Sequence, residues 1–421
     1  MRLTNTATLA FVAFFAGPPA QADSSAPAVL DTYANIAHAG YEDSLTRAQV
    51  LDMRISDLIA NPTDTNLALA RDAWRQARVP YQQTEVFRFG NPLVDDWEGL
   101  VNAWPLDEGL IDYVDGGYGD SSDENMFYAA NVVANPELRI GGVGVDATAI
   151  NADLLESLHE IDGVESNVSR GYHAIEFLLW GQDNNGTNHG AGNRPASDFD
   201  TANCTNGNCD RRADYLAASS NLLIADLQDA VAMWAPDGQA RAQLTEDGSD
   251  TGLSMILTGM GSLSYGELAG ERMQLGLLLH DPEEEHDCFS DNTHWSHFYD
   301  IVGIENVYLG QYTRIDGSVI SGPSLSQLVA EADAGVDAAM RTALNHTKSQ
   351  AMVMVTAAQA GKSYDQMLAE GDADGNRLVQ DVIDALRAQT QDIESVVVTL
   401  DLGGINVEGS DSLDDPNAVF Q

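Results

Sequence analysis

The chain has 421 residues and a formal net charge of −45, from 65 acidic and 20 basic side chains. A protein this acidic is repelled by phosphate backbones and anionic membranes, so nucleic acid is not an expected partner. The acidic residues could attract cations, and a strongly acidic surface is also typical of proteins from saline habitats. Three cysteines exclude a fold built on disulfides, and the length exceeds what one hydrophobic core usually fills, which favours two domains.

Residues 1–22 have the pattern of a secretory signal peptide. Arg2 gives a basic start, residues 9–15 form a short apolar core, and small residues precede a cleavage position after Ala22. This apolar run is too short to span a bilayer, and no other segment reaches about 20 apolar residues, so no transmembrane segment is expected. The sequence therefore predicts a periplasmic or otherwise exported protein.

Apolar residues recur at three- and four-residue steps over most of the remaining chain, a spacing that predicts helices. The helical segments are expected at 27–60, 64–89 with a kink at Pro80, 151–180, 211–235, 249–279, 324–360 and 374–399. Residues 395–400 look strand-like but are short, and no regular series of strands is present. We therefore expect an all-α protein with two helical-bundle domains and long irregular loops.

Two irregular stretches interrupt the helical pattern. Residues 114–146 are rich in Gly, Asp and Asn and are expected to form an excursion within the first domain. Residues 182–209 are the best candidate for a linker, which predicts an N-terminal domain at 23–181 and a C-terminal domain at 210–421. Within this linker, Cys204 and Cys209 are candidates for a local disulfide.

The most informative pair of residues is His173 and Glu176. A three-residue step on a helix puts both side chains on one face, about 5–6 Å apart at Cβ. The neighbouring residues are apolar nearly all round the helix, so the pair should be buried. Burying a carboxylate beside an imidazole is unfavourable unless a metal ion, a basic side chain or a substrate compensates.

A second helix carries Trp74, Arg78, Tyr81 and Glu85 on one face, at steps of four, three and four. An arginine and a glutamate within an aromatic stripe indicate either a polar site that lines a cleft or an ion pair between or within helices. Shortly afterwards come further candidate oxygen ligands, Asp107, Glu108 and Asp112. One imidazole with two or three carboxylates suits iron, zinc or manganese better than copper(I).

Four segments resemble those of one known family. Gly171-Tyr-His-Ala-Ile-Glu176 matches the Gly-x-His-x-x-Glu signature of the imelysin family, and residues 74–85 resemble its other characteristic helix. Residues 282–292 and 308–323 look like the subgroup called iron-regulated protein A. The resemblance therefore covers essentially the whole chain after residue 22.

This resemblance implies an exported bacterial protein with two helical-bundle domains and a His-x-x-Glu site near their interface. It also implies iron acquisition or metal handling. The partners would be a metal ion or metal chelate and an inner- or outer-membrane uptake component. The expected ion is divalent or trivalent, with iron favoured and zinc as the alternative.

Carried over residue by residue, the resemblance gives His173, Glu176 and Glu85 as metal ligands, with Asp107 as a further candidate. The residues that would line the cleft and orient these carboxylates are Trp74, Arg78 and Tyr81.

The family was named for a metallopeptidase activity, which makes a zinc-dependent peptidase at the same site the alternative function. The His-Glu-x-x-His motif of zinc proteases does not occur here, and Phe177 follows Glu176 where the inverse motif needs a histidine. His173 and Glu176 alone also leave a catalytic zinc short of ligands. A third possibility is a purely structural pair, with Arg78 neutralising Glu176.

A second group of histidines lies further along the chain. It comprises His280, His286, His294 and His297, four of the nine histidines, in an acidic stretch that also holds Cys288. The group is either a secondary metal cluster or an acidic surface loop with incidental histidines. Arg314 and Asp316 are candidates for lining the cleft between the domains or for forming a turn.

Overall fold

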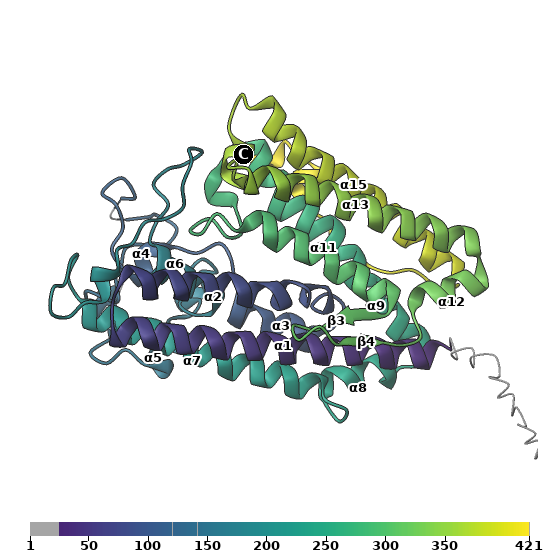
Figure 1. The fold of residues 1–421 in the computed structure, drawn as a ribbon, viewed down its shortest axis with the longest axis horizontal. Coiled ribbons are helices and arrows are strands. Elements are labelled where there is room, and N and C mark those ends of the chain that lie inside the picture. The colour runs from purple at the N-terminus through teal and green to yellow at the C-terminus, as the bar shows by residue number, and fades with distance from the viewer. Residues whose placement is uncertain (1–24, 120, 141, 421) are drawn as a thin grey trace, which may run out of the picture.

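The computed structural model describes residues 25–119, 121–140 and 142–420. The predicted signal peptide at 1–22 lies outside these residues. Among the described helices, none is long and apolar enough to cross a membrane. Helices dominate the described chain, which confirms the all-α prediction (Figure 1).

The first bundle is built around α1, a long helix that packs along α2 and α7 (Figure 1). The side chain of Thr63 begins α2 by accepting a hydrogen bond of 3.2 Å from the backbone N–H of Asn66, as an N-cap residue does. The helices of this part are α1 (Ala26–Ala60), α2 (Asp64–Gln82), α3 (Pro92–Asn102), α4 (Glu108–Ile111), α5 (Ala152–Leu158), α6 (Gly171–Trp180), α7 (Cys209–Trp234) and α8 (Gln239–Glu246).

The second bundle is built on the packing of α13 against α15, with α11 against α13 and a π-helix, η4, against α15. A π-helical stretch of this length is rare, and shorter ones are frequent at functional sites. The helices of this part are α9 (Ser249–Ser262), η4 (Leu263–Gln274), α10 (Leu275–Leu279), α11 (Thr293–Leu309), α12 (Leu325–Ala332), α13 (Ala334–Gln359), α14 (Tyr364–Leu368), α15 (Ala373–Thr399) and α16 (Asp411–Asp414).

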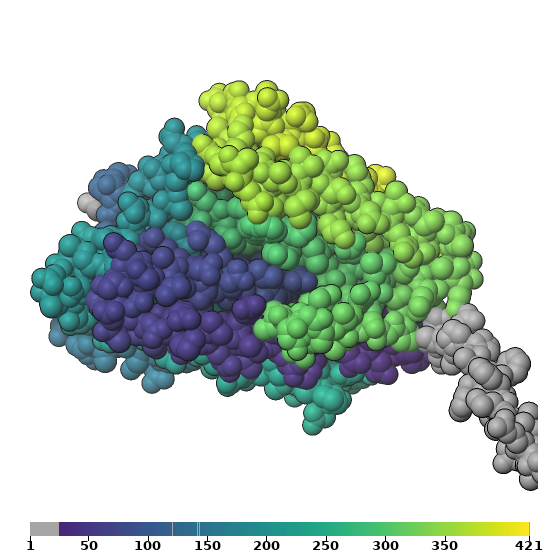
Figure 2. Space-filling model, in the orientation of Figure 1, coloured from purple at the N-terminus to yellow at the C-terminus, as the bar shows by residue number. Residues whose placement is uncertain are grey.

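Two short antiparallel hairpins and several single turns complete the fold. Strands β1 (Glu137–Ile140) and β2 (Val143–Asp146) form one hairpin, and β3 (Gln311–Thr313) and β4 (Val319–Ser321) form the other. Figure 2 shows the bundles in contact, with the green β3–β4 hairpin resting on purple α1. The turns are η1 (Glu85–Phe87), η2 (Ile161–Gly163), η3 (Ala196–Phe199), η5 (Pro282–Glu284) and η6 (Ala418–Phe420).

Several helix boundaries differ from those that the apolar spacing predicts. The helix expected at 64–89 ends at Gln82, two residues after Pro80, and the segment expected as one helix at 151–180 forms α5 and α6. The strand-like residues 395–400 lie at the end of α15, because Ile393, Val396 and Val397 share its buried face.

The packing boundary between the bundles lies later than the predicted linker at 182–209. Helix α7 follows that segment, yet it packs against α1, α5 and α6. The first bundle therefore extends at least to Trp234. Cys204 forms a disulfide with Cys209, the first residue of α7, and Cys288 is buried with its thiol free.

Candidate metal centre

His173 and Glu176 lie on α6, a helix whose ten residues are all buried. Gly171 begins this helix with φ at 83°, and a Cβ there would lie 2.5 Å from the backbone oxygen of Val101. Only glycine fits this position, which explains the first residue of the Gly-x-His-x-x-Glu motif. The close approach of α6 to α3 carries His173 and Glu176 into the interior.

The two side chains contact each other directly. His173 Nδ1 lies 3.1 Å from Glu176 Oε2, and Glu176 Oε1 accepts a hydrogen bond of 3.0 Å from the backbone N–H of Ser290. Burial, followed by the charge of Arg78, lowers the pKa of His173 well below its ordinary value, and burial raises the pKa of Glu176 well above its own. Both shifts favour the uncharged forms of the two groups.

His173 Nε2 is buried and has no hydrogen-bond partner among the described residues. A cation bound at Nε2 would require the imidazole proton on Nδ1, where it faces Glu176 Oε2, and would favour the ionised form of Glu176. This is the carboxylate–histidine–metal arrangement, in which the carboxylate orients the imidazole and raises its basicity.

A loop between η5 and α11 brings a second histidine and a carboxylate to His173. One ligand atom each from His173, His286 and Asp287 lies within 4.8 Å of the other two, and all three residues are buried. The imidazole rings of the histidines are 4.7 Å apart. Two imidazoles with one carboxylate form a donor set that suits iron(II) or zinc.

Arg78 of α2 lies beside this group and is almost completely buried. Its guanidinium donates to Asp287 Oδ1 at 2.9 Å and to Asn102 Oδ1 at 2.5 Å, and Nη2 lies 3.3 Å from His286 Nδ1. Burial alone would raise the pKa of Asp287, but Arg78 keeps it below its ordinary value. Arg78 therefore neutralises Asp287, whereas the structural hypothesis had paired it with Glu176.

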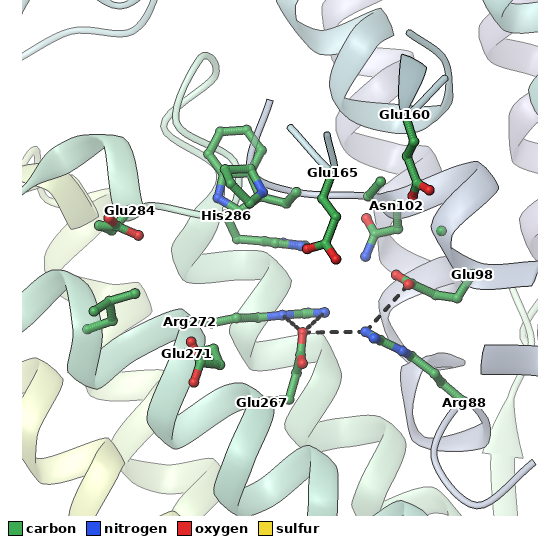
Figure 3. Close-up of a pocket in the computed structure, with 15 residues that line it drawn as sticks. Arg88, Glu98, Asn102, Glu160, Glu165, Glu267, Glu271, Arg272, Glu284 and His286 are labelled. Atoms are coloured by element: carbon green, nitrogen blue, oxygen red, sulfur yellow. Dashed lines mark hydrogen bonds and ion pairs between the residues drawn. The ribbon is translucent and has the colours of Figure 1, made fainter. Parts of the chain in front are cut away.

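A cavity of about 320 Å³ adjoins the group, with His286 in its wall (Figure 3). Arg272 and Glu267, both on η4, form an ion pair of 2.7 Å there, and Arg88 links Glu267 to Glu98 across the cavity. Six glutamates line this space against two arginines, so its charge favours cations. The six are Glu98, Glu160, Glu165, Glu267, Glu271 and Glu284.

Three of these glutamates, Glu160, Glu165 and Glu271, are solvent-exposed, whereas His286 is buried. The cavity therefore leads from an acidic surface to the edge of the buried group. A Trp104 ring packs 5.1 Å from that of His173 and also lines the cavity.

The comparisons with known proteins agree with this architecture. A family model described as Imelysin matches residues 37–393. The chain belongs to the imelysin family. Iron-regulated protein A of Synechococcus elongatus is 46% identical over 46 residues, which span 11% of this chain and 13% of that relative.

The fold also resembles a solved structure, that of a proposed iron-regulated protein A precursor from Parabacteroides distasonis. The TM-score is 0.64 at 18% sequence identity, and the match covers 91% of this chain and 97% of the other. This imelysin therefore shares its fold with that protein.

Glu85 and Asp107, the other predicted ligands of this imelysin, do not belong to the group formed by His173, His286 and Asp287. Glu85 accepts from Arg272 at 2.8 Å and contacts Asn102 at 3.4 Å, so one side chain separates it from Arg78. Asp107 lies in a loop, where it accepts hydrogen bonds from Asn125 and Ser166.

The aromatic residues of the stripe enclose Arg78. The rings of Trp74, Tyr81 and Tyr172 lie 5.0 to 5.6 Å from its guanidinium carbon. Trp74 Nε1 also donates to the backbone oxygen of Tyr172 at 2.9 Å. Their contacts with Arg78 place these rings around the ion pair with Asp287.

Arg314 and Asp316 lie in the β3–β4 hairpin, where they have structural partners. Arg314 forms an ion pair of 2.8 Å with Asp43 of α1, and Asp316 accepts from the backbone N–H of Ser318 in the turn. Their contacts attach and shape the hairpin.

The histidines of the second group separate in the structure. His286 joins His173, whereas His280 Nδ1 lies 2.7 Å from the backbone oxygen of Leu368. His297 is fully buried against Tyr364, and burial lowers its pKa to about 3. His294 is also buried, and burial lowers its pKa to about 4.

Two residues of the site, Asp287 and Asn102, belong to none of the motifs predicted from the sequence. Asp287 directly follows His286 within the segment that resembles iron-regulated protein A. This adjacency to a candidate ligand is the one feature of the sequence that could have indicated a role for Asp287. No comparable pattern marks Asn102, which bridges Arg78 and Glu85.

Proposed function

We propose that this imelysin is an exported metal-binding protein of iron acquisition or handling, with His173, His286 and Asp287 as ligands. The supporting observation is the buried, unpartnered Nε2 of His173 beside a second imidazole and a carboxylate. Glu176 orients His173 and is not itself a ligand in this proposal. Iron is favoured over zinc because two similar proteins are named iron-regulated protein A.

In this proposal the ion is cargo, and the residues of the chain have distinct tasks. The glutamates of the cavity attract a cation, and burial keeps both imidazoles uncharged, so that each can offer a lone pair to it. Arg78 keeps Asp287 ionised when no cation is bound. An uptake component at the inner or outer membrane would exchange the ion with the protein.

Metal content tests the proposal. Protein purified without chelators and challenged with iron(II), iron(III) or zinc should bind one equivalent by mass spectrometry, and His173→Ala should lose it. His346→Ala is the matched control, because His346 is exposed on α13. Retention of the ion by His173→Ala, or its loss from the control, would exclude the proposed site.

Glu176→Gln should weaken zinc binding by about 10–100-fold, because the amide no longer holds the proton on Nδ1 as a carboxylate does. Isothermal titration calorimetry gives the affinity directly. The charge-matched control is Glu394→Gln, an exposed position on α15. Equal affinities for the wild type and Glu176→Gln would remove Glu176 from its orienting role.

A zinc-dependent peptidase is the second candidate function. The cavity beside His286 favours it, because its space adjoins the proposed ligands and several of its glutamates could act as a base. This function requires peptide cleavage that chelators abolish and zinc restores. Zinc binding at His173 without any cleavage would leave the binding protein as the function.

A further inference from the structure

A second group of acidic side chains lies next to the first site. One carboxylate oxygen each from Glu285, Asp291 and Asp365 lies within 4.8 Å of the other two. Glu285 is 1% exposed and Asp365 0%, so two of the three side chains are essentially excluded from water.

These carboxylates lack the partners that buried oxygens normally have. Glu285 Oε2, Asp291 Oδ1 and both carboxylate oxygens of Asp365 are buried without a hydrogen-bond partner among the described residues. Leaving such oxygens unpaired costs several kcal/mol for each group by general estimates, unless a ligand or a proton compensates. The oxygens of Asp365 are the clearest case: the Ser363 hydroxyl and the backbone N–H of Gln366 lie close enough to lower its pKa, but neither makes a hydrogen bond of ordinary geometry to them.

No basic side chain forms an ion pair with them either, although Arg75 is near enough to Asp291 to lower its pKa slightly against the effect of burial. Other buried carboxylates form arginine ion pairs, such as Asp112 with Arg212 and Asp287 with Arg78. In the described part of the chain, none of the three has an Arg, Lys or His nitrogen within 4.0 Å. The nearby Arg75 packs on the Trp180 ring at 5.0 Å and donates to the backbone oxygen of Ser290.

We propose that Glu285, Asp291 and Asp365 bind a hard divalent cation of the calcium class, in addition to the site at His173. Carboxylate oxygens are the ligands that Ca²⁺ prefers, and its flexible coordination accepts three protein carboxylates completed by water. The absence of nitrogen and sulfur donors disfavours zinc and iron(II) here. This proposal does not depend on the proposed function.

The electrostatics of the group favour a bound cation. Burial and the neighbouring carboxylates raise the pKa of Asp291 to about 7, and burial is the main cause that raises the pKa of Asp365 to about 6. Each shift reports a carboxylate whose charge is poorly compensated, which a bound cation would correct.

The position of the second site gives it a structural role. Glu285 and Asp291 bracket the segment that presents His286 and Asp287, and Asp365 lies on α14. A cation bound by all three would attach this segment to α14. It would thereby fix the two ligands that the segment supplies to the first site.

Calcium titration of chelator-treated protein at physiological salt tests the proposal. Isothermal titration calorimetry near neutral pH should show one saturable Ca²⁺ site in the wild type and a rise in melting temperature on binding. Asp365→Asn and Glu285→Gln should each weaken Ca²⁺ binding at least 100-fold, while the surface control Glu394→Gln retains it. His173→Ala should retain it as well, which separates this site from the first.

Stability without calcium gives a second measurement. Asp365→Asn should melt at the same or a higher temperature than the wild type in chelator, because it removes repulsion between carboxylates. Absence of a saturable Ca²⁺ site in the wild type, or equal binding in the Asp365→Asn and Glu285→Gln variants, would overturn the proposal. A marked loss of metal-free stability in Asp365→Asn would also overturn it, since Asp365 would then have a protein partner.

Discussion

Arg78→Met should lower the free energy of unfolding of the metal-free protein by about 3–5 kcal/mol, because it removes one partner of a buried ion pair. Asp287 is 0% exposed and would keep only neutral hydrogen-bond donors from Asn292 and Ser296. Urea unfolding in the presence of a chelator measures the loss. The control is Arg54→Met, since Arg54 forms an exposed ion pair with Asp57, and such pairs contribute at most about 1 kcal/mol.

The same variant should gain more stability from zinc than the wild type does. Arg78 contacts both Asp287 Oδ1 and His286 Nδ1, so its guanidinium and a bound cation compete for the same groups. In Arg78→Met the cation would be the only positive charge beside Asp287, and zinc should restore part of the lost stability. A smaller zinc-dependent gain than in the wild type would contradict this competition.

Arg78→Lys separates charge from geometry. Lysine keeps a positive charge but lacks the planar fork that reaches Asn102 and Asp287 together. We expect a stability between those of the wild type and Arg78→Met. A lysine variant as stable as the wild type would show that charge alone is sufficient at this position.

Local patterns made much of the helical fold predictable. The spacing of apolar residues gave the start of α2 at Asp64 and the extent of α1 to within a residue, because both helices bury one continuous face. The strand-like appearance of residues 395–400 was a wrong indication, because the preference of β-branched residues for strands is an average that packing can override. Here Val396 and Val397 pack in the core while Val398 is 79% exposed, which is helical periodicity.

The candidate site was predictable only where its residues are close in sequence. His173 and Glu176 are three residues apart, so helical geometry alone brings them together. His286 and Asp287 reach them from a loop more than 100 positions later, and nothing local in the sequence encodes that contact. Glu85 followed the stripe of α2 in sequence, but the helix ends before it and η1 turns it toward Arg272.

Asp112→Asn should also be strongly destabilising, by about 3–5 kcal/mol, because it leaves buried Arg212 without its carboxylate and leaves Arg194 with that of Asp198 alone. Arg212 contacts both oxygens of Asp112, at 2.6 and 3.0 Å, and Arg194 donates to it at 2.7 Å. Asp112 is 1% exposed, and both arginine side chains are fully buried. These contacts join the segment before α7 to the first bundle, so their loss should unfold that region first.

The pH dependence of this effect has a defined sign. Burial alone would raise the pKa of Asp112, but Arg194 and the hydrogen bonds from Arg212 lower it below its ordinary value. A carboxyl whose pKa is depressed by folding contributes its full stabilisation above the unfolded-state pKa of about 3.9 and loses it as the pH falls toward the folded-state value. The difference between wild type and Asp112→Asn should therefore be constant from about pH 7 to about pH 5 and shrink below about pH 4.

Urea unfolding of both proteins across this pH range measures the difference. Asp115→Asn is the matched control, because Asp115 lies three positions along the chain, is exposed, and its carboxylate accepts from the backbone N–H of Gly117. A difference in unfolding free energy below about 1 kcal/mol at neutral pH would mean that the ion pairs of Asp112 contribute no more than exposed pairs do. A difference that grows in acid would mean that folding raises the pKa of Asp112, because only then does its ionised form oppose the folded state.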